Sequence, residues 1–530
     1  MAFITLAELF GYITETYTAG VIESSQRQRL RMLEAGLEDG PLINERQDPL
    51  EDFHKFHPND AIFQEYDPPP GDDSKMGWKR SRPTKWWMSL WKAMKCVFCI
   101  QFIGGLAVGS LTMSIMVLAF NSADLCYDSQ SQNWTSLPGK IQAIIVTGES
   151  VQAFVVQMWS FLFIVAMFGW PLVKKLNLMS LNLLGALIGT CYLLYLQVYG
   201  IYEKSWMPFP ENALFLIIVL MNSILVGREI AKNSETDKKR KKTIKVSAIL
   251  AAQFVLGIPI TWGLVYGLIP LYSRQNETYR ALIATTFPLI IVIPKIIVRL
   301  VGQRNDFLHP GESYVLTSSL YSEYMVVFRV MQADLTSLNL FILLSFMHGS
   351  VDLLERLTIV MRDYLWYFIY KKLKQDAAEA EEMLSADKFR TPRSMRFIAD
   401  MSIQMILGES TALIAAVGFR QMYIFMYSNN SSSFADIHLL ADFFIRVTIG
   451  LSIDLMFNSF SFWMQMSYLN VAVVRVWKKK WHKHVVVGFI LTTLTMCYFT
   501  TYLFAIVEDK YSSGGTERHF NCTGPFSRFY

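Results

Sequence analysis

The chain has 530 residues, of which 52% are hydrophobic and only 18% carry a charge. Soluble domains carry about 25% charged residues, so this composition excludes an ordinary soluble protein and indicates that lipid is part of the solvent. The net charge of +5 hides an acidic N-terminal segment followed by basic loops. We expect no nucleic-acid partner.

Residues 1–74 are expected to form an acidic, largely flexible tail in the cytosol. They hold fifteen Asp and Glu residues against five Lys and Arg. High net charge and low hydrophobicity are typical of segments that cannot bury a core. Only the stretch up to about Leu37 looks helical. The chain start has no basic region and no small-residue cleavage site, so we do not expect a cleaved signal peptide.

The tail contains Glu38-Asp39-Gly40-Pro41-Leu42-Ile43, which is similar to an acidic dileucine sorting signal. Glu38, Leu42 and Ile43 are its defining residues. The motif predicts a sorting adaptor as a partner and a location in the plasma membrane or in the endosomal or lysosomal membrane.

Residues 75–95 reverse the charge and form a basic, tryptophan-rich juxtamembrane segment. Seven Lys and Arg residues alternate here with Trp78, Trp86, Trp87 and Trp91. Basic residues and interfacial tryptophans mark a cytosolic membrane boundary.

Long apolar runs then predict an all-α polytopic membrane protein of about nine transmembrane helices. A helix advances about 1.5 Å per residue, so about 20 apolar residues cross a hydrocarbon core of roughly 30 Å. The runs lie near residues 96–120, 144–170, 177–201, 212–230, 246–271, 281–301, 402–428, 438–467 and 485–507. We expect a six-span bundle over 96–301, a three-span bundle over 402–507, and an extracellular or lumenal tail at 508–530.

Two independent patterns place the N-terminus in the cytosol and the C-terminus outside or in the lumen. The presumed inner segments hold twenty-nine Lys and Arg residues and the presumed outer segments hold seven, which is a positive-inside bias. Every glycosylation acceptor motif falls in an outer segment. The acceptors are Asn133, Asn276, Asn429, Asn430 and Asn521.

Residues 302–401 are expected to form a cytosolic or in-plane helical insert. The charged residues Asp334, Asp352 and Glu355 flank the most apolar stretch, and no second clean apolar run accompanies it. We therefore favour inner-face amphipathic helices or a re-entrant hairpin over 302–370. Two short crossings of the membrane are the alternative, because the segments before and after this stretch are both predicted to lie inside.

The cysteines suggest one disulfide and one lipidation site. Cys126 and Cys522 are the pair in predicted outer segments, where oxidising conditions favour a disulfide. Cys96 and Cys99 lie beside the basic cluster, as S-palmitoylation sites do. Small apolar residues in a helix explain these two cysteines equally well.

Glycines and prolines indicate how the helices pack and where they break. Small residues four apart allow close helix contact, and prolines free backbone carbonyls that must face protein or a cavity. The glycine pairs are Gly105 with Gly109 and Gly185 with Gly189, and the prolines are Pro259, Pro270, Pro288 and Pro294. Broken helices of this kind line substrate cavities in transporters, although a simple kink is the alternative.

Six ionisable residues lie within predicted spans: Glu149, Lys295, Glu409, Arg420, Arg446 and Asp454. A charge at the bilayer centre costs at least about 2.5 to 3.5 kcal/mol, so each should face the bundle interior and find a partner. One interpretation is that they form ion pairs that fix helix neighbours. In the other interpretation, Glu149, Arg420 and Arg446 form an outer access site, and Lys295, Glu409 and Asp454 form a deeper relay.

No catalytic signature, phosphate-binding loop or dinucleotide fingerprint is present, and we expect neither an enzyme nor a cofactor. His348 and Asp352 share a helical face, as a general-base pair or a polar pair at a membrane boundary would. The remaining histidine pairs lack further ligands at metal spacing, so no metal site is predicted. These pairs are His54 with His57 and His482 with His484.

The last apolar run contains Thr501-Tyr502 followed by Leu503-Phe504-Ala505-Ile506-Val507. This ending resembles that of insect gustatory receptors, and the resemblance implies a seven-spanning, ligand-gated cation channel with the same orientation. The family's next residues, Gln-Phe, are replaced here by Glu508-Asp509.

Taken together, these patterns favour a solute or ion transporter of the plasma or endosomal membrane. The partners are the lipid bilayer and a small solute or ion that the sequence does not name. A ligand-gated channel or chemoreceptor, and a non-transporting receptor or cargo escort, are the alternatives.

Overall fold

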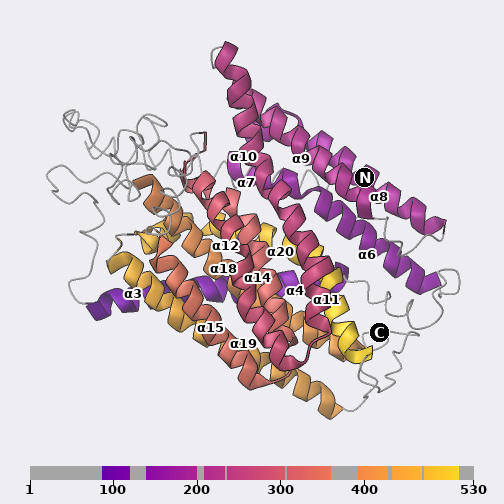
Figure 1. Ribbon diagram of the computed structural model, residues 1–530, viewed down its shortest axis with the longest axis vertical. Helices are drawn as coiled ribbons and strands as arrows, with labels where there is room; N and C mark the ends of the chain where they lie inside the picture. Colours follow the sequence, from indigo (N-terminus) through magenta and orange to yellow (C-terminus); the bar gives the residue numbers. More distant parts are fainter. Residues whose placement is uncertain are drawn as a thin grey trace.

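The computed structural model describes residues 86–119, 139–199, 208–232, 236–304, 307–308, 310–359, 392–427, 433–467, 469 and 471–512. Every regular element in these ranges is a helix, which confirms the all-α class (Figure 1). The acidic tail and the sorting motif with Glu38, Leu42 and Ile43 lie outside the described residues.

The first half of the chain forms helices that are interrupted by short π-helical or kinked segments. They are α3 (Trp86–Phe102), η3 (Ile103–Gly109), α4 (Ser110–Ala119), α6 (Gly139–Gln157), α7 (Trp159–Lys175), α8 (Leu178–Val198), α9 (Pro208–Ile230), α10 (Thr236–Trp262), η5 (Gly263–Leu268) and α11 (Ile269–Ser273). The two π-helices are η3 and η5. Because Pro259 and Pro270 flank η5, the predicted break in this helix coincides with an irregular segment.

The second half contains the longest helices. They are α12 (Glu277–Arg304), α13 (Pro310–Ser313), α14 (Val315–Asp334), α15 (Leu338–Leu357), α18 (Pro392–Tyr427), α19 (Ser433–Ser467) and α20 (Val473–Ser512). In Figure 1, α8, α9 and α10 lie on one side, α3, α15 and α19 lie on the other, and α12, α14 and α18 run between them.

Within the ranges that the structure describes, seven helices are long and apolar enough to cross a membrane, so the chain has the features of a polytopic membrane protein. These candidate spans are Trp86–Ser114, Val146–Lys175, Leu178–Leu196, Phe209–Ile230, Lys239–Thr261, Leu338–Leu357 and Met395–Gln421. The expected count of nine is not confirmed. Among the described residues, the predicted spans in α12, α19 and α20 are long helices but are not in this set.

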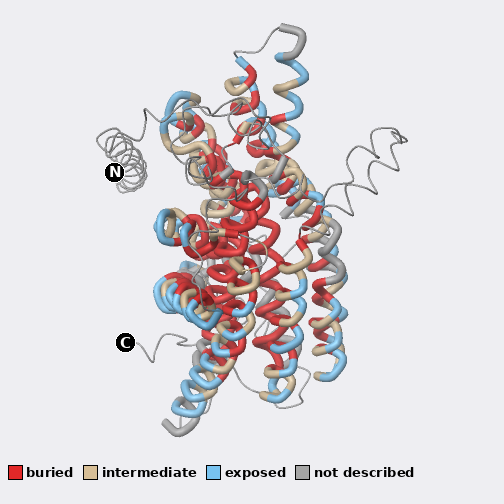
Figure 2. Tube along the Cα trace, turned by 90° about the vertical axis from the view of Figure 1, so that its left-hand side faces the viewer, coloured by how far each residue is buried: buried red, intermediate tan, exposed pale blue. Residues whose placement is uncertain are grey.

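The described part of 302–401 differs from the in-plane insert that we expected. Helix α15 is itself one of the seven candidate spans. Helix α14 is buried along its whole length, packed between α12, α18 and α20. Figure 2 shows that buried residues gather in the centre of the bundle. Because protein surrounds α14 on every side, it does not need the apolar surface that a lipid-facing helix needs.

Helix α14 extends the full length of the bundle. Just before its start, Glu312 forms an ion pair with Lys483, and the Tyr314 ring lies 5.0 Å from the His484 ring. At its far end, Asp334 accepts a 3.0 Å hydrogen bond from Arg280, beside the turn between α11 and α12. The two ends of α14 therefore contact opposite ends of the bundle.

Glycines mark the closest helix contacts. A Cβ atom on Gly105 would lie 2.8 Å from Ile414 of α18, and one on Gly109 would lie 3.1 Å from the same residue. A Cβ atom on Gly185 of α8 would meet Ile218 of α9 at 2.0 Å. Gly105, Gly109 and Gly185 thus lie where a side chain of the facing helix packs closely, whereas Gly189 has only an ordinary 3.4 Å contact with Gln157.

Candidate functional site

A cavity of about 310 Å³ lies between the α6–α7 junction and helices α9, α10 and α14. Most of its wall is apolar and aromatic. It is lined by Val156, Trp159, Phe209, Asn212, Ala213, Phe215, Leu216, Gln253, Phe254, Gly257, Thr261, Ser319, Leu320 and Glu323. A concave apolar site with a few convergent polar groups is the usual form of a small-molecule site.

The hydrogen-bonded polar groups of the cavity come from α10 and α14, and α9 adds Asn212. Thr261 Oγ1 donates a 2.7 Å hydrogen bond to Glu323 Oε1, and Ser319 donates to the side-chain oxygen of Gln253. Within the described ranges, Glu323 has no basic side chain at salt-bridge distance, although it is only 7% exposed. The cavity therefore presents a buried carboxyl group whose charge no neighbouring protein cation balances.

Gly257 and the proline break shape this part of the cavity. Gly257 and Thr261 line the cavity on either side of Pro259, which cannot donate to the carbonyl of Val255. A Cβ atom on Gly257 would lie 3.9 Å from Glu323 Oε2. The prediction that prolines mark a cavity thus coincides with a cavity at Pro259.

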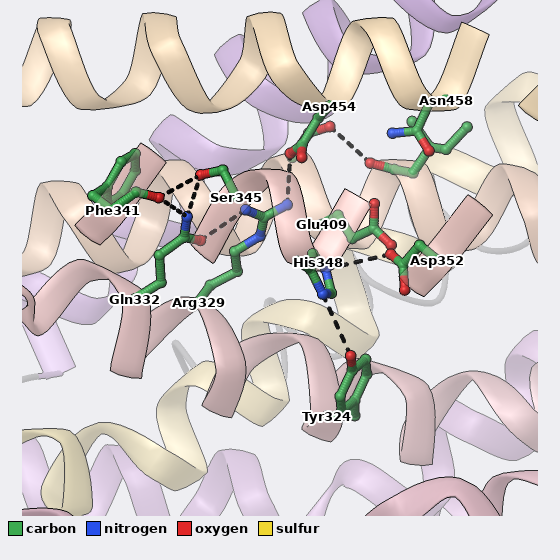
Figure 3. A network of polar contacts seen from close by, with 12 residues as sticks. Tyr324, Arg329, Gln332, Phe341, Ser345, His348, Asp352, Glu409, Asp454 and Asn458 are labelled. Carbon is green, nitrogen blue, oxygen red and sulfur yellow. Dashed lines mark hydrogen bonds and ion pairs between the residues drawn. The ribbon is translucent and has the colours of Figure 1, made fainter. Parts of the chain in front are cut away.

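A second polar region is a cluster of buried ionisable side chains between α14, α15, α18 and α19 (Figure 3). His348 and Asp352 from α15 meet Glu409 from α18, and potential ligand atoms of the three lie within 4.8 Å of one another. His348 Nε2 is 3.3 Å from Asp352 Oδ2. The Tyr324 hydroxyl lies 3.4 Å from His348 Nδ1 on the other side of the ring.

Arg356 contacts both carboxyl groups of this cluster. Its Nη2 donates to Glu409 Oε1 at 3.1 Å and lies 3.9 Å from Asp352 Oδ2. Its Nη1 donates to the side-chain oxygen of Asn458. Arg356 is 2% exposed, so water does not screen these contacts.

Two further ion pairs flank the cluster. Arg329 donates to Asp454 Oδ2 at 2.6 Å and to Gln332 Oε1 at 2.8 Å. Lys295 donates to Glu355 Oε2 at 3.1 Å, and its ammonium lies 4.0 Å from the centre of the Tyr324 ring.

The partners of the six predicted intramembrane residues differ from the relay that we expected. Lys295 pairs with Glu355, and Glu409 and Asp454 pair with arginines. Arg446 of α19 contacts Asp442 and donates to the carbonyls of Leu335 and Thr336. Lys295, Glu409 and Asp454 therefore have separate partners. The reason is that 302–370, which we placed at the inner face, supplies basic and acidic side chains to the bundle interior.

The predicted outer access site is only partly described. Arg420 of α18 is 9% exposed, whereas the side chain of Glu149 in α6 lies outside the described residues. Arg446 has the partners given above, on the connection between α14 and α15.

Sequence reasoning missed Glu323, Arg329, Glu355 and Arg356. One signal was present, because His348, Asp352 and Arg356 are spaced four apart and so form a polar stripe on one face of α15. A stripe of that kind on an otherwise apolar helix indicates a polar partner inside the bundle.

The remaining predicted sites are described only in part. Cys96 is buried and Cys99 is exposed, so only the second is accessible for lipidation. Asn276 is exposed at the start of α12, where its side chain accepts a hydrogen bond from the Tyr279 amide. The other acceptors, Asn133, Asn429, Asn430 and Asn521, and the disulfide partners Cys126 and Cys522 lie outside the described residues. Those predictions stand untested.

Comparison with known proteins places this chain in no family. No family model, no curated protein and no solved structure matches it.

Proposed function

We propose that this chain is a membrane transporter that binds a small organic solute in the cavity beside Glu323. The observation that carries this proposal is a cavity of about 310 Å³ inside a bundle of candidate membrane helices, next to the proline break of α10. Irregular backbone at membrane depth is tolerated where it lines a cavity or is buried in protein, and transporters place substrate sites at such breaks.

The chemistry of the wall suggests the kind of solute. Trp159, Phe215 and Phe254 supply aromatic faces, and Glu323 supplies one carboxyl group without a protein cation. An apolar molecule with a cationic or hydrogen-bond-donating group complements that wall, because the group would satisfy the carboxyl oxygens.

The proposed topology has eleven crossings, with the N-terminus inside and the C-terminus outside. It counts the seven candidate spans and adds α12, α14, α19 and α20. The contacts of α14 with the predicted inner segment at Lys483 and with the predicted outer turn at Arg280 support two crossings by α14 and α15. Adding two crossings keeps the orientation that the charge bias predicts.

A ligand-gated channel or chemoreceptor, or a non-transporting escort, would use the same cavity differently. Purified protein in liposomes separates these classes. Saturable uptake with counterflow indicates a carrier, and unitary currents indicate a channel. An escort gives neither.

The direct test uses uptake of labelled N-methyl-phenylpyridinium, an apolar aromatic cation, by proteoliposomes. Glu323→Gln should reduce its apparent affinity about tenfold or more, because a charge-assisted contact contributes about 1.5 to 3 kcal/mol. Glu229→Gln is the matched control, since Glu229 lies on α9 but outside the cavity and pairs with Lys175. Saturable uptake that is equal in wild type and Glu323→Gln would contradict this use of the cavity.

A further inference from the structure

Two buried carboxyl groups in the centre of the bundle lie next to each other, with carboxylate oxygens within 4.8 Å. They are Asp352 of α15, 4% exposed, and Glu409 of α18, 2% exposed. Two ionised carboxylates have no proton to place between them, and like charges this close are strongly unfavourable in a medium of low dielectric. The contact therefore requires a proton or another cation.

The cations around the pair mostly contact other carboxylates. From α12, Lys295 faces the pair but is bonded to Glu355 of α15, and Arg299 lies 3.9 Å from the same carboxylate. From α14, Arg329 is bonded to Asp454 of α19. Among the described residues, Arg356 is the only cation that contacts Asp352 and Glu409 directly. One guanidinium contacts two carboxylates, and a proton held between them would remove the repulsion that remains at this contact.

Uncharged groups complete the surroundings of the pair. His348 lies 3.3 Å from Asp352, and its ring stacks on Phe328 at 4.0 Å between centroids. The phenol of Tyr324 lies at the other nitrogen of the ring. Oδ1 of Asp352 and Nε2 of His348 have no hydrogen-bond partner among the described residues. These two unsatisfied atoms lie on neighbouring groups of the cluster, where a proton can pass between them.

We propose that Asp352 and Glu409 together hold one exchangeable proton. When this proton leaves, the Arg356 guanidinium bonds both carboxylates instead. In the protonated form, one carboxyl O–H donates to the other carboxylate, and Arg356 bonds mainly to Glu409. When the proton transfers to His348 Nε2, the O–H bond breaks and an N–H bond forms. The Arg356 guanidinium, now 3.9 Å from Asp352 Oδ2, moves closer and bonds both carboxylates.

A proton fits this site better than a metal ion. One histidine and two carboxylates are suitable ligands for a transition metal, but Arg356 Nη2 lies 3.1 Å from Glu409 Oε1. A divalent ion on that oxygen would lie against a guanidinium, and the two positive charges would repel each other. Metal binding is therefore the alternative that calorimetry would detect.

Helix α14 connects the proton site to the cavity. Its consecutive residues Glu323 and Tyr324 contact the two regions, the first lining the cavity and the second facing His348. A shift of α14 on proton release would therefore change the cavity. This coupling rests on the proposed transport function, whereas the proton site itself does not.

Infrared difference spectroscopy of the protein in lipid nanodiscs tests the proton site. A carbonyl stretch of a protonated carboxyl group should be present at acid pH, shift in deuterated water, and disappear as the pH is raised. Glu409→Gln should remove that band. Asp442→Asn is the control and should leave the band in place, because Asp442 pairs with Arg446 outside the cluster.

Three results would overturn the proposal. One is a pH-titrating carboxyl band that is identical in wild type and in folded Glu409→Gln and Asp352→Asn variants. Another is a wild-type spectrum without an exchangeable carboxyl band, a measurement that needs no variant. The third is stoichiometric binding of Zn²⁺ or Mn²⁺ by calorimetry that His348→Ala abolishes, which would make the cluster a metal site.

A separate measurement tests the coupling. If the wild type binds the pyridinium cation but the pH dependence of binding is unchanged in Glu409→Gln, the proton site is not coupled to the cavity. If binding is absent while the carboxyl band behaves as expected, the cavity assignment fails and the proton site remains.

Discussion

Arg329 and Asp454 join α14 to α19 through a pair of charges that water does not reach. Their contact is 2.6 Å long, and their side chains are 0% and 3% exposed. Removing one partner of such a pair leaves an uncompensated buried charge, which costs about 3 to 5 kcal/mol. We expect Arg329→Met to lower the thermal midpoint of the detergent-solubilised protein strongly.

The double variant Arg329→Met with Asp454→Leu should recover most of that loss, because an apolar pair of similar volume removes both charges together. The exposed pair of Lys175 and Glu229 is the control. Lys175→Met should change the thermal midpoint little, since solvent screens that contact. Equal shifts for the buried and exposed variants would show that Arg329 does not have this structural role.

At the level of elements, the sequence predicted helices best where they are apolar over the length of a membrane. The runs that became α8 and α9, which are partly exposed, and α18, which is buried, are all of this kind, and periodicity is not needed to find them. Helix α14 was missed because it faces protein on all sides and can carry Glu323, Arg329 and Gln332. Hydropathy identifies a buried helix only when its residues are apolar, as in α18, and it misses one whose buried residues are polar, as in α14.

The sequence predicted some residues of the candidate site but not their partners. Buried charge within spans pointed to Lys295, Glu409 and Asp454, but their partners lie on α14 and α15. Pairing depends on which helices are neighbours, and one sequence does not contain that information. The break at Pro259 was visible, whereas the opposing wall with Trp159 and Ser319 was not.

The contact between α9 and α10 depends on the missing side chain of Gly227. A Cβ atom there would lie 2.9 Å from the backbone carbonyl of Thr243 and 2.5 Å from Ser247 Oγ. Backbone cannot move aside cheaply, so Gly227→Ala should destabilise the protein by about 1 to 3 kcal/mol through overpacking. Gly263→Ala is the control because a Cβ atom there meets nothing within 4 Å. Thermal midpoints of the two variants that do not differ would contradict this account of the α9–α10 contact.

For the whole molecule, α14 is the element that joins the two regions of interest. It packs against α10 on the cavity side and against α12, α18 and α20 in the rest of the core. Its position also supports the proposed topology, because a central helix that spans the bundle would be entered from one side and left from the other. The short connection between α14 and α15 should then lie on the outer side, next to the turn that carries Asn276.

Cysteine accessibility tests that placement. Thr336 lies in the connection between α14 and α15, where it is exposed and donates to Glu277 Oε1 at 2.7 Å. In a background with Cys126→Ser and Cys522→Ser, we expect Thr336→Cys to react with a membrane-impermeant maleimide on intact cells.

Lys239→Cys, at the basic start of α10, is the matched control and should react only after permeabilisation, because the charge bias places this segment inside. A glycan on Asn276 would fix the orientation of the neighbouring turn independently. If Asn276 is glycosylated but Thr336→Cys reacts only in permeabilised cells, α14 and α15 enter from the cytosolic side without crossing. The eleven-crossing topology would then be wrong. The contact between Asp334 and Arg280, which supports that topology, would also need another explanation.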